Sequence, residues 1–355
     1  MILMNDFKAE PLELREAMLK AANRVLESGW YVLGNECKQF EEQWSTVCGV
    51  GHGIGVANGM DAIEIALLGL SIGGGDEVIT TPMTAFATIL AIIRSGAKPV
   101  LADIDSETAL LSIESVRRSL TANTKAVILV HLYGQVRQMD EWVNFCEENK
   151  IMLIEDCAQA HQATWEGKVA GSFGQAGAYS FYPTKNLGAV GDAGMLVTNN
   201  STLAEKARQL RNYGQSERYL HPVVGMNSRL DEIQAVMLSE RMKWLPEFTK
   251  CRRQIADTYH AKIDNPLVKH LIKPEQKSAH VYHLFVITCP QRDALQAHLL
   301  KKGVQALIHY PVPVQQQKPC SEFARDPKGL KNSEKHASMC LSLPCHPQMP
   351  NTDIE

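Results

Sequence analysis

The sequence predicts an α/β protein with a mostly parallel mixed sheet flanked by helices, plus a smaller C-terminal α/β domain. Short continuous apolar runs alternate with helix-like stretches, which is typical of strands buried on both faces of a parallel sheet. A length of 355 residues suggests two domains. The alternation changes character near Pro246, so we place a large domain at 1–245 and a small domain at 246–355.

The elements of the first half follow from apolar spacing. In segment 11–28, Leu14, Met18, Ala21 and Val25 share one helical face, with a proline at the start and a glycine at the end. A second amphipathic helix is expected around 36–47. Strands are expected at 53–57, 77–80, 98–103, 125–131 and 151–156, with helices at 60–70, 84–95, 112–120 and 138–149 between them.

The second half begins with two expected strands, 176–182 and 193–198, joined by a loop that contains glycine. A strand is also expected from residue 280 (HVYHLFVIT). Helices are expected at 201–211, 228–245, 247–262 and 291–302.

The composition excludes several classes of protein. The chain has 36 basic and 39 acidic residues, a net charge of −3, so we expect neither nucleic-acid nor membrane binding. No signal peptide and no apolar run of ~20 residues is present, so we expect a cytoplasmic enzyme. The nine cysteines form no CxxC pair, which favours free thiols. The histidines and cysteines of 336–346, and His280 with His283, match no zinc pattern, so no metal is expected.

The turn GVANGMDA at 55–62 joins a predicted strand to a helix. Asn58 and Gly59 suit the turn, and the amides that follow lie at a helix N-terminus, where they favour a phosphate. An ordinary strand-to-helix turn remains the alternative for this segment alone. Neither GxGxxG nor a Walker A sequence is present.

Two further segments carry reactive side chains. IMLIEDCAQAH delivers Asp156 to the C-terminal end of a strand, where it could bind metal, act as a base, pair with a ring nitrogen or simply cap a helix beginning at 157. In AYSFYPTKNLGAVGDAGM, Lys185 lies in a loop of small residues, five positions after Ser180. A lone lysine is usually a surface charge, but an enclosed lysine loses its proton more easily and forms imines.

Pyridoxal phosphate (PLP) requires all of these parts together. It needs a phosphate cradle, a lysine that forms an imine and an acid opposite the pyridinium nitrogen. The order of turn, Asp156 and Lys185 along the chain meets that need.

From Asp6 to Asp353 the sequence resembles sugar aminotransferases of the DegT/DnrJ/EryC1 type, which have the type I fold of PLP enzymes. The resemblance rests on nine segments in the same order: NGMDAIEIAL, ITTPMTAFATILAI, VHLYGQ, IEDCAQAH, SFYPTKNLGAVGDAG, LRNYG, GMNSRLDEIQA, HYPVP and LSLP.

The resemblance implies a role for each matching residue. Lys185 would hold PLP as an imine and carry the proton during catalysis, while Asp156 would pair with the pyridinium nitrogen. Gln159 would lie near the ring hydroxyl, and Phe86 would stack on the ring. The remaining cofactor contacts would come from Gly59, the amides of Met60 and Asp61, the Ser180 hydroxyl and, from the partner subunit, Asn227. Met60 stands where relatives often have threonine, so a hydroxyl contact to the phosphate is lost.

The resemblance also implies a homodimer with shared active sites and L-glutamate as the amino donor. The segments SFYPTKNLGAVGDAG and GMNSRLDE are more similar to enzymes acting on nucleotide-linked, dTDP-carried 3-keto-6-deoxyhexoses than to the 4-keto branch, which often has TGEGG in place of VGDAG. Tyr182, His309, Tyr310 and Arg229 would then contact the sugar nucleotide. The product would be a 3-amino-3,6-dideoxyhexose for a surface polysaccharide such as O-antigen or for natural-product glycosylation.

Four alternatives stay open on the sequence. They are a 4-keto sugar aminotransferase, a sugar dehydratase of the same fold, a non-catalytic regulatory protein and an unrelated dehydrogenase. Lys185 argues against the dehydratase, in which a histidine replaces the lysine, and the missing glycine fingerprint argues against the dehydrogenase.

Overall fold

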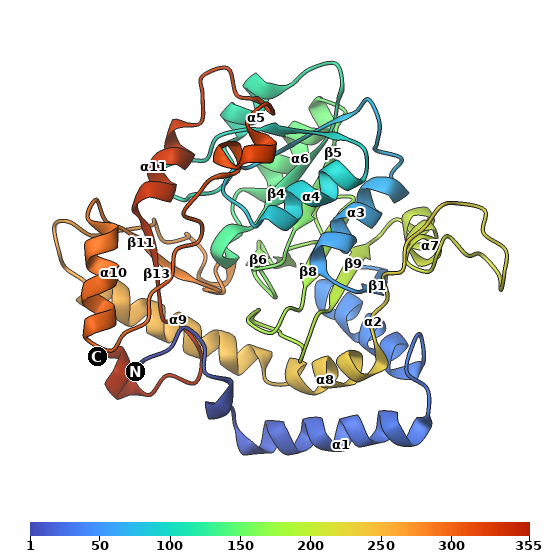
Figure 1. Cartoon of the computed structure of the whole chain (residues 1–355), viewed down its shortest axis with the longest axis horizontal. Coiled ribbons are helices and arrows are strands. Elements are labelled where there is room, and N and C mark those ends of the chain that lie inside the picture. The colour runs from blue at the N-terminus through green and yellow to red at the C-terminus, as the bar shows by residue number, and fades with distance from the viewer.

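The computed structural model describes residues 1–355, and an eight-stranded sheet forms its centre (Figure 1). The strand order is β1-β9-β8-β5-β4-β2-β3-β12. Only β9 runs antiparallel to its neighbours, so the carboxyl ends of all the other strands meet at one edge of the sheet. The bounds are β1 His52–Val56, β2 Glu77–Thr80, β3 Lys98–Leu101, β4 Thr124–Val130, β5 Met152–Asp156, β8 Ala176–Ser180, β9 Gly194–Thr198 and β12 Ala324–Arg325.

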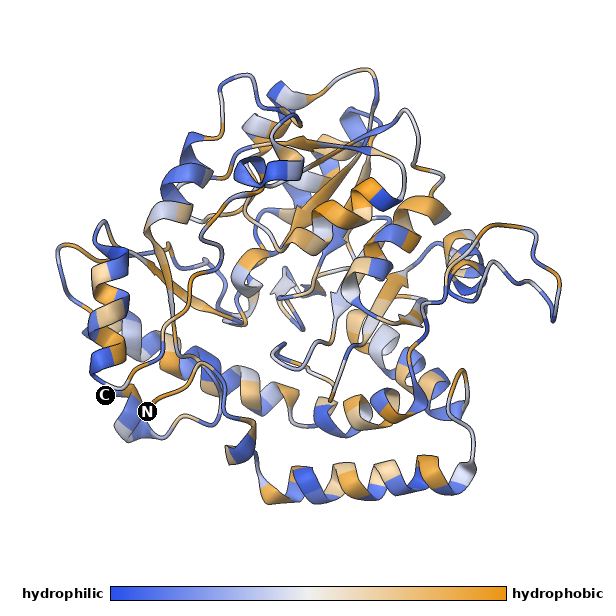
Figure 2. Ribbon diagram, in the orientation of Figure 1, coloured by the Kyte–Doolittle hydropathy of each residue, from blue (hydrophilic) through white to orange (hydrophobic).

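Helices cover both faces of this sheet, as the expected α/β architecture requires. The central strand β4 has Ile128 and Val130 in one apolar cluster, and Val127 and Leu129 in another. Burial on both faces explains why the strands are continuously apolar, and Figure 2 shows the apolar residues of the sheet and of α3 and α4 at the centre of the molecule. The helices are α1 Leu12–Ser28, α2 Asn35–Cys48, α3 Gly59–Gly69, α4 Phe86–Arg94, α5 Ile113–Ser119, α6 Met139–Glu148, α7 Ser201–Leu210, α8 Glu232–Met242, α9 Leu245–Lys262, α10 Arg292–Lys301, α11 Lys331–Met339 and α12 Asn351–Ile354.

A smaller antiparallel sheet lies in the C-terminal part of the chain. Its order is β10 (Lys269–His270), β11 (Phe285–Thr288) and β13 (Cys340–Leu343), and it shares an apolar cluster with α9. Two segments cross the boundary predicted at 246. β12 pairs with β3 in the large sheet, and Ile2 bridges Val304. The division into two domains at that residue stays a prediction.

Two expected elements begin four or five residues later than their sequence pattern, because tertiary hydrogen bonds replace local ones. The strand expected from 280 begins at Phe285, since the Val281 amide donates to Gly134 O at 2.9 Å in a different part of the chain. The helix expected from 228 begins at Glu232, because the Ser228 amide donates to Arg211 O at 2.9 Å. A short hairpin, β6 (Thr164–Trp165) with β7 (Lys168–Val169), was not expected.

None of the helices combines the length and the apolar character that crossing a bilayer requires.

Candidate active site

The predicted cofactor residues converge on the carboxyl edge of the large sheet. The turn at 58–61 follows β1, Phe86 follows β2, Asp156 ends β5, and Ser180 ends β8. Lys185 lies in the loop that leaves β8. Parallel strands bring these segments together although they are separated by up to 127 residues in the sequence.

The turn before α3 and the end of β8 touch each other. A Cβ on Gly59 would lie 2.7 Å from Ser180 Cβ, and a Cβ on Gly194 would overlap the Asn58 carbonyl group. Asn58 Oδ1 accepts the Asp61 amide at 2.9 Å, which caps α3. The amides of Gly59 and Met60 are the first two of α3, so no carbonyl within the helix accepts a hydrogen bond from them. They and the Ser180 hydroxyl form a cradle suited to phosphate, whereas the Asp61 amide already has an acceptor.

Asp156 is a buried carboxylate without a cationic partner. Its side chain accepts from Thr88 Oγ1 at 2.8 Å and from the Ala158 amide at 3.1 Å, and no basic nitrogen lies within 4 Å. No helix begins at 157, so the alternative that Asp156 caps a helix is wrong, and Asp156 caps a turn. A buried carboxylate normally has a charged partner, so this environment suits a protonated ring nitrogen.

Lys185 is held in a tight loop. Its amide donates to Tyr182 O at 2.8 Å, and a Cβ on Gly188 would overlap the Pro183 carbonyl. Burial lowers the pKa of Lys185 from 10.5 to about 8, and the Asp156 carboxylate opposes the shift. A larger fraction of free amine at neutral pH is what imine formation requires.

The residue after Lys185 joins this loop to the segment before β11. Asn186 donates from Nδ2 to Val281 O at 3.1 Å and accepts from His283 Nδ1 at 3.2 Å. The pKa of His283 lies well below its usual value because of burial and the nearby Lys185. The imidazole is therefore neutral, with its proton on Nδ1 and an unprotonated Nε2.

A hydrogen-bonded set connects Gln159 with the HYPVP segment. Gln159 donates to Tyr310 Oη at 3.3 Å and accepts the Tyr133 amide at 2.6 Å. Tyr133 donates its hydroxyl proton to His309 O at 2.6 Å, and His309 Nδ1 lies 2.8 Å from Ser342 Oγ. Burial and Lys185 lower the pKa of His309 to about 4, and burial raises the pKa of Tyr310 to about 12. Three predicted site residues thus lie in one network.

Phe86 is the first residue of α4 and is partly buried. It packs against an apolar cluster that includes Ile89 and Val314. Two positions later, Thr88 reaches Asp156, so the start of α4 lies beside the pyridinium partner.

Within one chain, the side chains of the remaining predicted residues make no hydrogen bond to the cofactor residues. Asn227 is exposed and pairs with Asn212, while Arg229 donates to Asn212 Oδ1 at 3.1 Å and lies over the Tyr213 ring. Both follow a loop, residues 213–226, that projects from the molecule beyond α7 (Figure 1). Tyr182 is 51% exposed.

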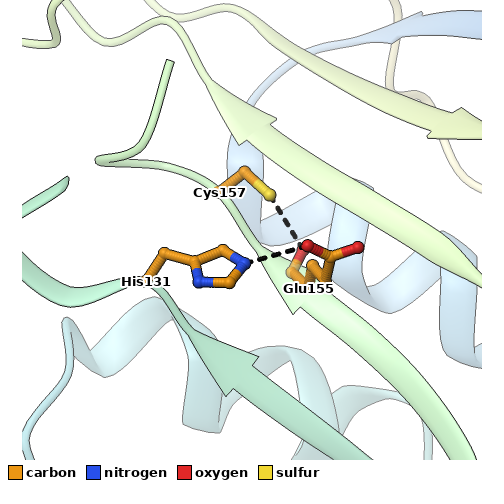
Figure 3. A group of neighbouring side chains, drawn as sticks. All are labelled: His131, Glu155 and Cys157. Atoms are coloured by element: carbon orange, nitrogen blue, oxygen red, sulfur yellow. Dashed lines mark hydrogen bonds and ion pairs between the residues drawn. The ribbon is translucent and has the colours of Figure 1, made fainter. Parts of the chain in front are cut away.

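His131, Glu155 and Cys157 form a compact buried group that resembles a metal site in composition (Figure 3). The Glu155 carboxylate accepts from His131 Nε2 at 2.9 Å and from three backbone amides, of Gly171, Phe173 and Gly174. Burial and the nearby Glu155 hold the pKa of the Cys157 thiol well above its usual value. With the carboxylate engaged and the thiol protonated, the group fits a structural hydrogen-bond network better than a cation site.

Residues 12–355 match the model of the DegT/DnrJ/EryC1/StrS aminotransferase family. The chain belongs to this family. It is therefore an aminotransferase.

Relatives and solved structures agree with that assignment over the full chain. The chain is 42% identical to the dTDP-3-amino-3,6-dideoxy-α-D-galactopyranose transaminase of Aneurinibacillus thermoaerophilus, covering 100% of this chain and 97% of that protein. It is 40% identical to the pleiotropic regulatory protein of Geobacillus stearothermophilus, over 98% and 94% of the two chains. The crystal structure of S. venezuelae DesV in complex with a ketimine intermediate matches with a TM-score of 0.95 and 37% identity, over 99% and 95%.

Other relatives are named for sugars linked to UDP or GDP. The UDP-N-acetyl-3-dehydro-α-D-glucosamine 3-aminotransferase of Acidithiobacillus ferrooxidans is 38% identical over 99% of this chain and 95% of that protein. The GDP-perosamine synthase of Escherichia coli O157:H7 is 32% identical over 82% and 81%. Family membership thus establishes sugar amination as the chemistry and leaves the substrate open.

Sequence reasoning missed several residues of this site, among them Thr88, Tyr133, Asn186 and His283. Asn186 and His283 carried a weak signal, because one follows Lys185 and the other interrupts an apolar strand pattern. No local pattern in the sequence connects Thr88 with Asp156, because that contact spans 68 residues. The same holds for Tyr133 and His309, whose contact spans 176 residues.

Proposed function

We propose that this aminotransferase uses PLP to transfer an amino group from L-glutamate to a dTDP-linked 3-keto-6-deoxyhexose. The observation that carries the proposal is the meeting, at one sheet edge, of a lysine with a pKa of about 8, an unpaired buried carboxylate and a phosphate cradle. The relative named a dTDP-3-amino-3,6-dideoxy-α-D-galactopyranose transaminase supports the sugar.

The residues of the site fit PLP, which when bound supplies an electron sink for breaking bonds at the carbon that bears nitrogen. Asp156 would keep the pyridine nitrogen protonated, and the amides of Gly59 and Met60 with Ser180 Oγ would hold the phosphate. Phe86 would cover the ring, and Gln159 would orient the ring hydroxyl. Lys185 would accept and return the proton that moves during transfer, because a base with a pKa near the working pH does both.

The sugar would enter beside Tyr182, His309 and Tyr310. The neutral His309 has its Nδ1 directed to Ser342, which leaves Nε2 for a sugar hydroxyl or phosphate group. The partner subunit's Arg229 would neutralise the negative charge of the diphosphate. The 4-keto aminotransferase remains the second candidate, supported by the relative named GDP-perosamine synthase.

Two measurements test the proposal. Borohydride reduction of the purified protein followed by peptide mapping should place the cofactor label on Lys185, and a label elsewhere would contradict the assigned role. Incubation with glutamate and a panel of dTDP-, UDP- and GDP-linked 3-keto and 4-keto sugars should yield a 3-amino sugar fastest from the dTDP-linked 3-keto substrate. Faster amination at C4 would favour the second candidate.

A further inference from the structure

A cavity of about 740 Å³ lies between the small sheet and the loop that follows β3. Its walls come from α9, β10, the segment after β10, α11 and residues 106–107. The volume is within the range of small-molecule sites, roughly 300–1,000 Å³. None of its lining residues belongs to the predicted cofactor or substrate set.

Positive charge dominates the walls of this cavity. Lys269, Lys273 and Lys335 line it, and Glu107 is the only acidic residue among its walls. Neither Lys269 nor Lys335 has a carboxylate within 4 Å, and Lys273 lies 4.0 Å from Asp257. Two of the three wall lysines thus have no ion-pair partner, and such lysines around a concave surface raise the local concentration of anions.

Histidines complete the lining. The rings of His260 and His270 lie 4.8 Å apart, and burial together with Lys273 and His270 lowers the pKa of His260 to about 4. His270 Nε2 lies 3.0 Å from Ile263 O, while its Nδ1 is buried and has no hydrogen-bond partner. A buried ring nitrogen without a partner is unusual. Because Nε2 donates to the Ile263 carbonyl, Nδ1 of the neutral ring bears the lone pair and accepts hydrogen bonds.

The cavity also touches the active-site network. His336, a buried wall residue, has Nε2 2.9 Å from Tyr133 Oη. Tyr133 in turn contacts His309 O through its hydroxyl and Gln159 through its amide. One fully buried residue, Tyr133, therefore links the cavity wall to His309 through its side chain and to Gln159 through its backbone.

We propose that this cavity binds a phosphate-bearing metabolite, and that binding there affects the active site through His336 and Tyr133. Lysines bind phosphate as compact point charges, and three of them line this cavity. The binding part of the proposal does not depend on which sugar the enzyme aminates.

The first test is calorimetric titration of the cofactor-loaded protein with inorganic phosphate and, separately, with ADP. Bound cofactor occupies the cradle at Gly59, so added phosphate cannot bind there and contribute to the measured heat. We expect saturable binding that the double variant Lys269→Gln, Lys335→Gln weakens at least tenfold. The matched control Lys301→Gln, Lys302→Gln removes the same charge from exposed positions on and just after α10 and should change affinity less than twofold.

The two ligands separate the possible sources of phosphate. Equal affinity for both identifies the phosphoryl group alone as the ligand, whereas tighter binding of ADP that the variant Lys269→Gln, Lys335→Gln weakens adds a nucleoside to the occupant. Binding of both ligands that this variant leaves unchanged would take place at the sugar-nucleotide site and would overturn the cavity as the binding site. Absence of saturable binding up to about 10 mM, or equal weakening by both double variants, would overturn the site.

The second test measures the KM for the sugar nucleotide with and without saturating ligand. We expect a change in KM in the parent enzyme that Tyr133→Phe abolishes while ligand affinity is retained. An unchanged KM in the parent enzyme, at full occupancy, would overturn the connection to the active site.

Discussion

At the scale of single residues, the environment of Lys185 disfavours the protonated, charged form of its side chain. The folded-state pKa of about 8 lies below the unfolded value near 10.4. Below pH 8 both states are protonated, so the folded protein bears the full cost of burying an ammonium group. Between pH 8 and about 10.4 the unfolded state binds more protons, and stability rises with pH.

Lys185→Met should therefore stabilise the cofactor-free protein at pH 7, by at most about 3 kcal/mol, and much less at pH 10. Calorimetric melting temperatures at the two pH values measure the difference. Lys301→Met, at an exposed position, is the control and should give no such pH dependence. A stabilisation of equal size at both pH values would show that charge burial is not its cause.

Replacing Asn186 tests whether its hydrogen bonds hold the loop that contains Lys185. Asn186→Ala would leave Val281 O and His283 Nδ1 without partners, and should cost about 1–3 kcal/mol of unfolding free energy. Because Lys185 is adjacent, we also expect kcat to fall at least tenfold with a smaller change in KM.

The control for that experiment is Asn200→Ala, which removes the N-cap of α7, a hydrogen bond of 3.0 Å to the Leu203 amide. It should cost a similar 0.5–2 kcal/mol, as N-cap substitutions do, and leave kcat unchanged. Urea unfolding and steady-state kinetics distinguish the two variants. A parallel loss of kcat in both would assign the effect to stability alone.

At the scale of elements, the start of α3 depends on a glycine from another strand. Gly194 begins β9, and its lack of a side chain lets the Asn58 turn lie directly against the strand. The position of the Gly59 and Met60 amides therefore depends on β9 as much as on α3.

Gly194→Ala should displace this turn and weaken PLP binding to the cofactor-free protein at least tenfold. Absorbance titration with PLP measures the effect. Gly74→Ala is the matched control, because a Cβ there meets nothing within 4 Å, and it should bind PLP normally. Normal affinity in Gly194→Ala would mean that the turn does not hold the phosphate.

At the scale of the whole molecule, the side chains of Asn227 and Arg229 make no hydrogen bond to the cofactor residues of their own chain. Asn227 and Arg229 follow the loop 213–226, whose Tyr219 and Val224 are 80% and 94% exposed. A projecting apolar loop beside predicted ligand contacts is expected where a second copy of the chain completes the site.

Mixed dimers test this proposal. Lys185→Ala and Asn227→Ala chains are each expected to be weak or inactive alone. If Asn227 serves the partner's site, random mixing should restore activity at about a quarter of the sites, since half of the dimers are mixed and each has one intact site. No gain in activity on mixing would mean that Asn227 and Lys185 of one chain act in the same active site.

The sequence by itself determined the fold class and the order of strands and helices, because burial on both faces of a parallel sheet leaves a continuous apolar pattern in each strand. It also identified Asp156 and Lys185 as candidates, because strand ends and small-residue loops are visible locally. Element boundaries were less certain where hydrogen bonds cross the fold, as at 228–231 and 280–284.

Only the tertiary structure decided which environment each candidate has. The missing cation around Asp156, the contact of Gly59 with Ser180 and the attachment of Asn186 to His283 all join segments far apart in the chain. The same holds for the basic cavity, whose lysines lie in β10, after β10 and in α11. Long-range packing sets burial and charge neighbours, and these determine the pKa of Lys185, which no local pattern encodes.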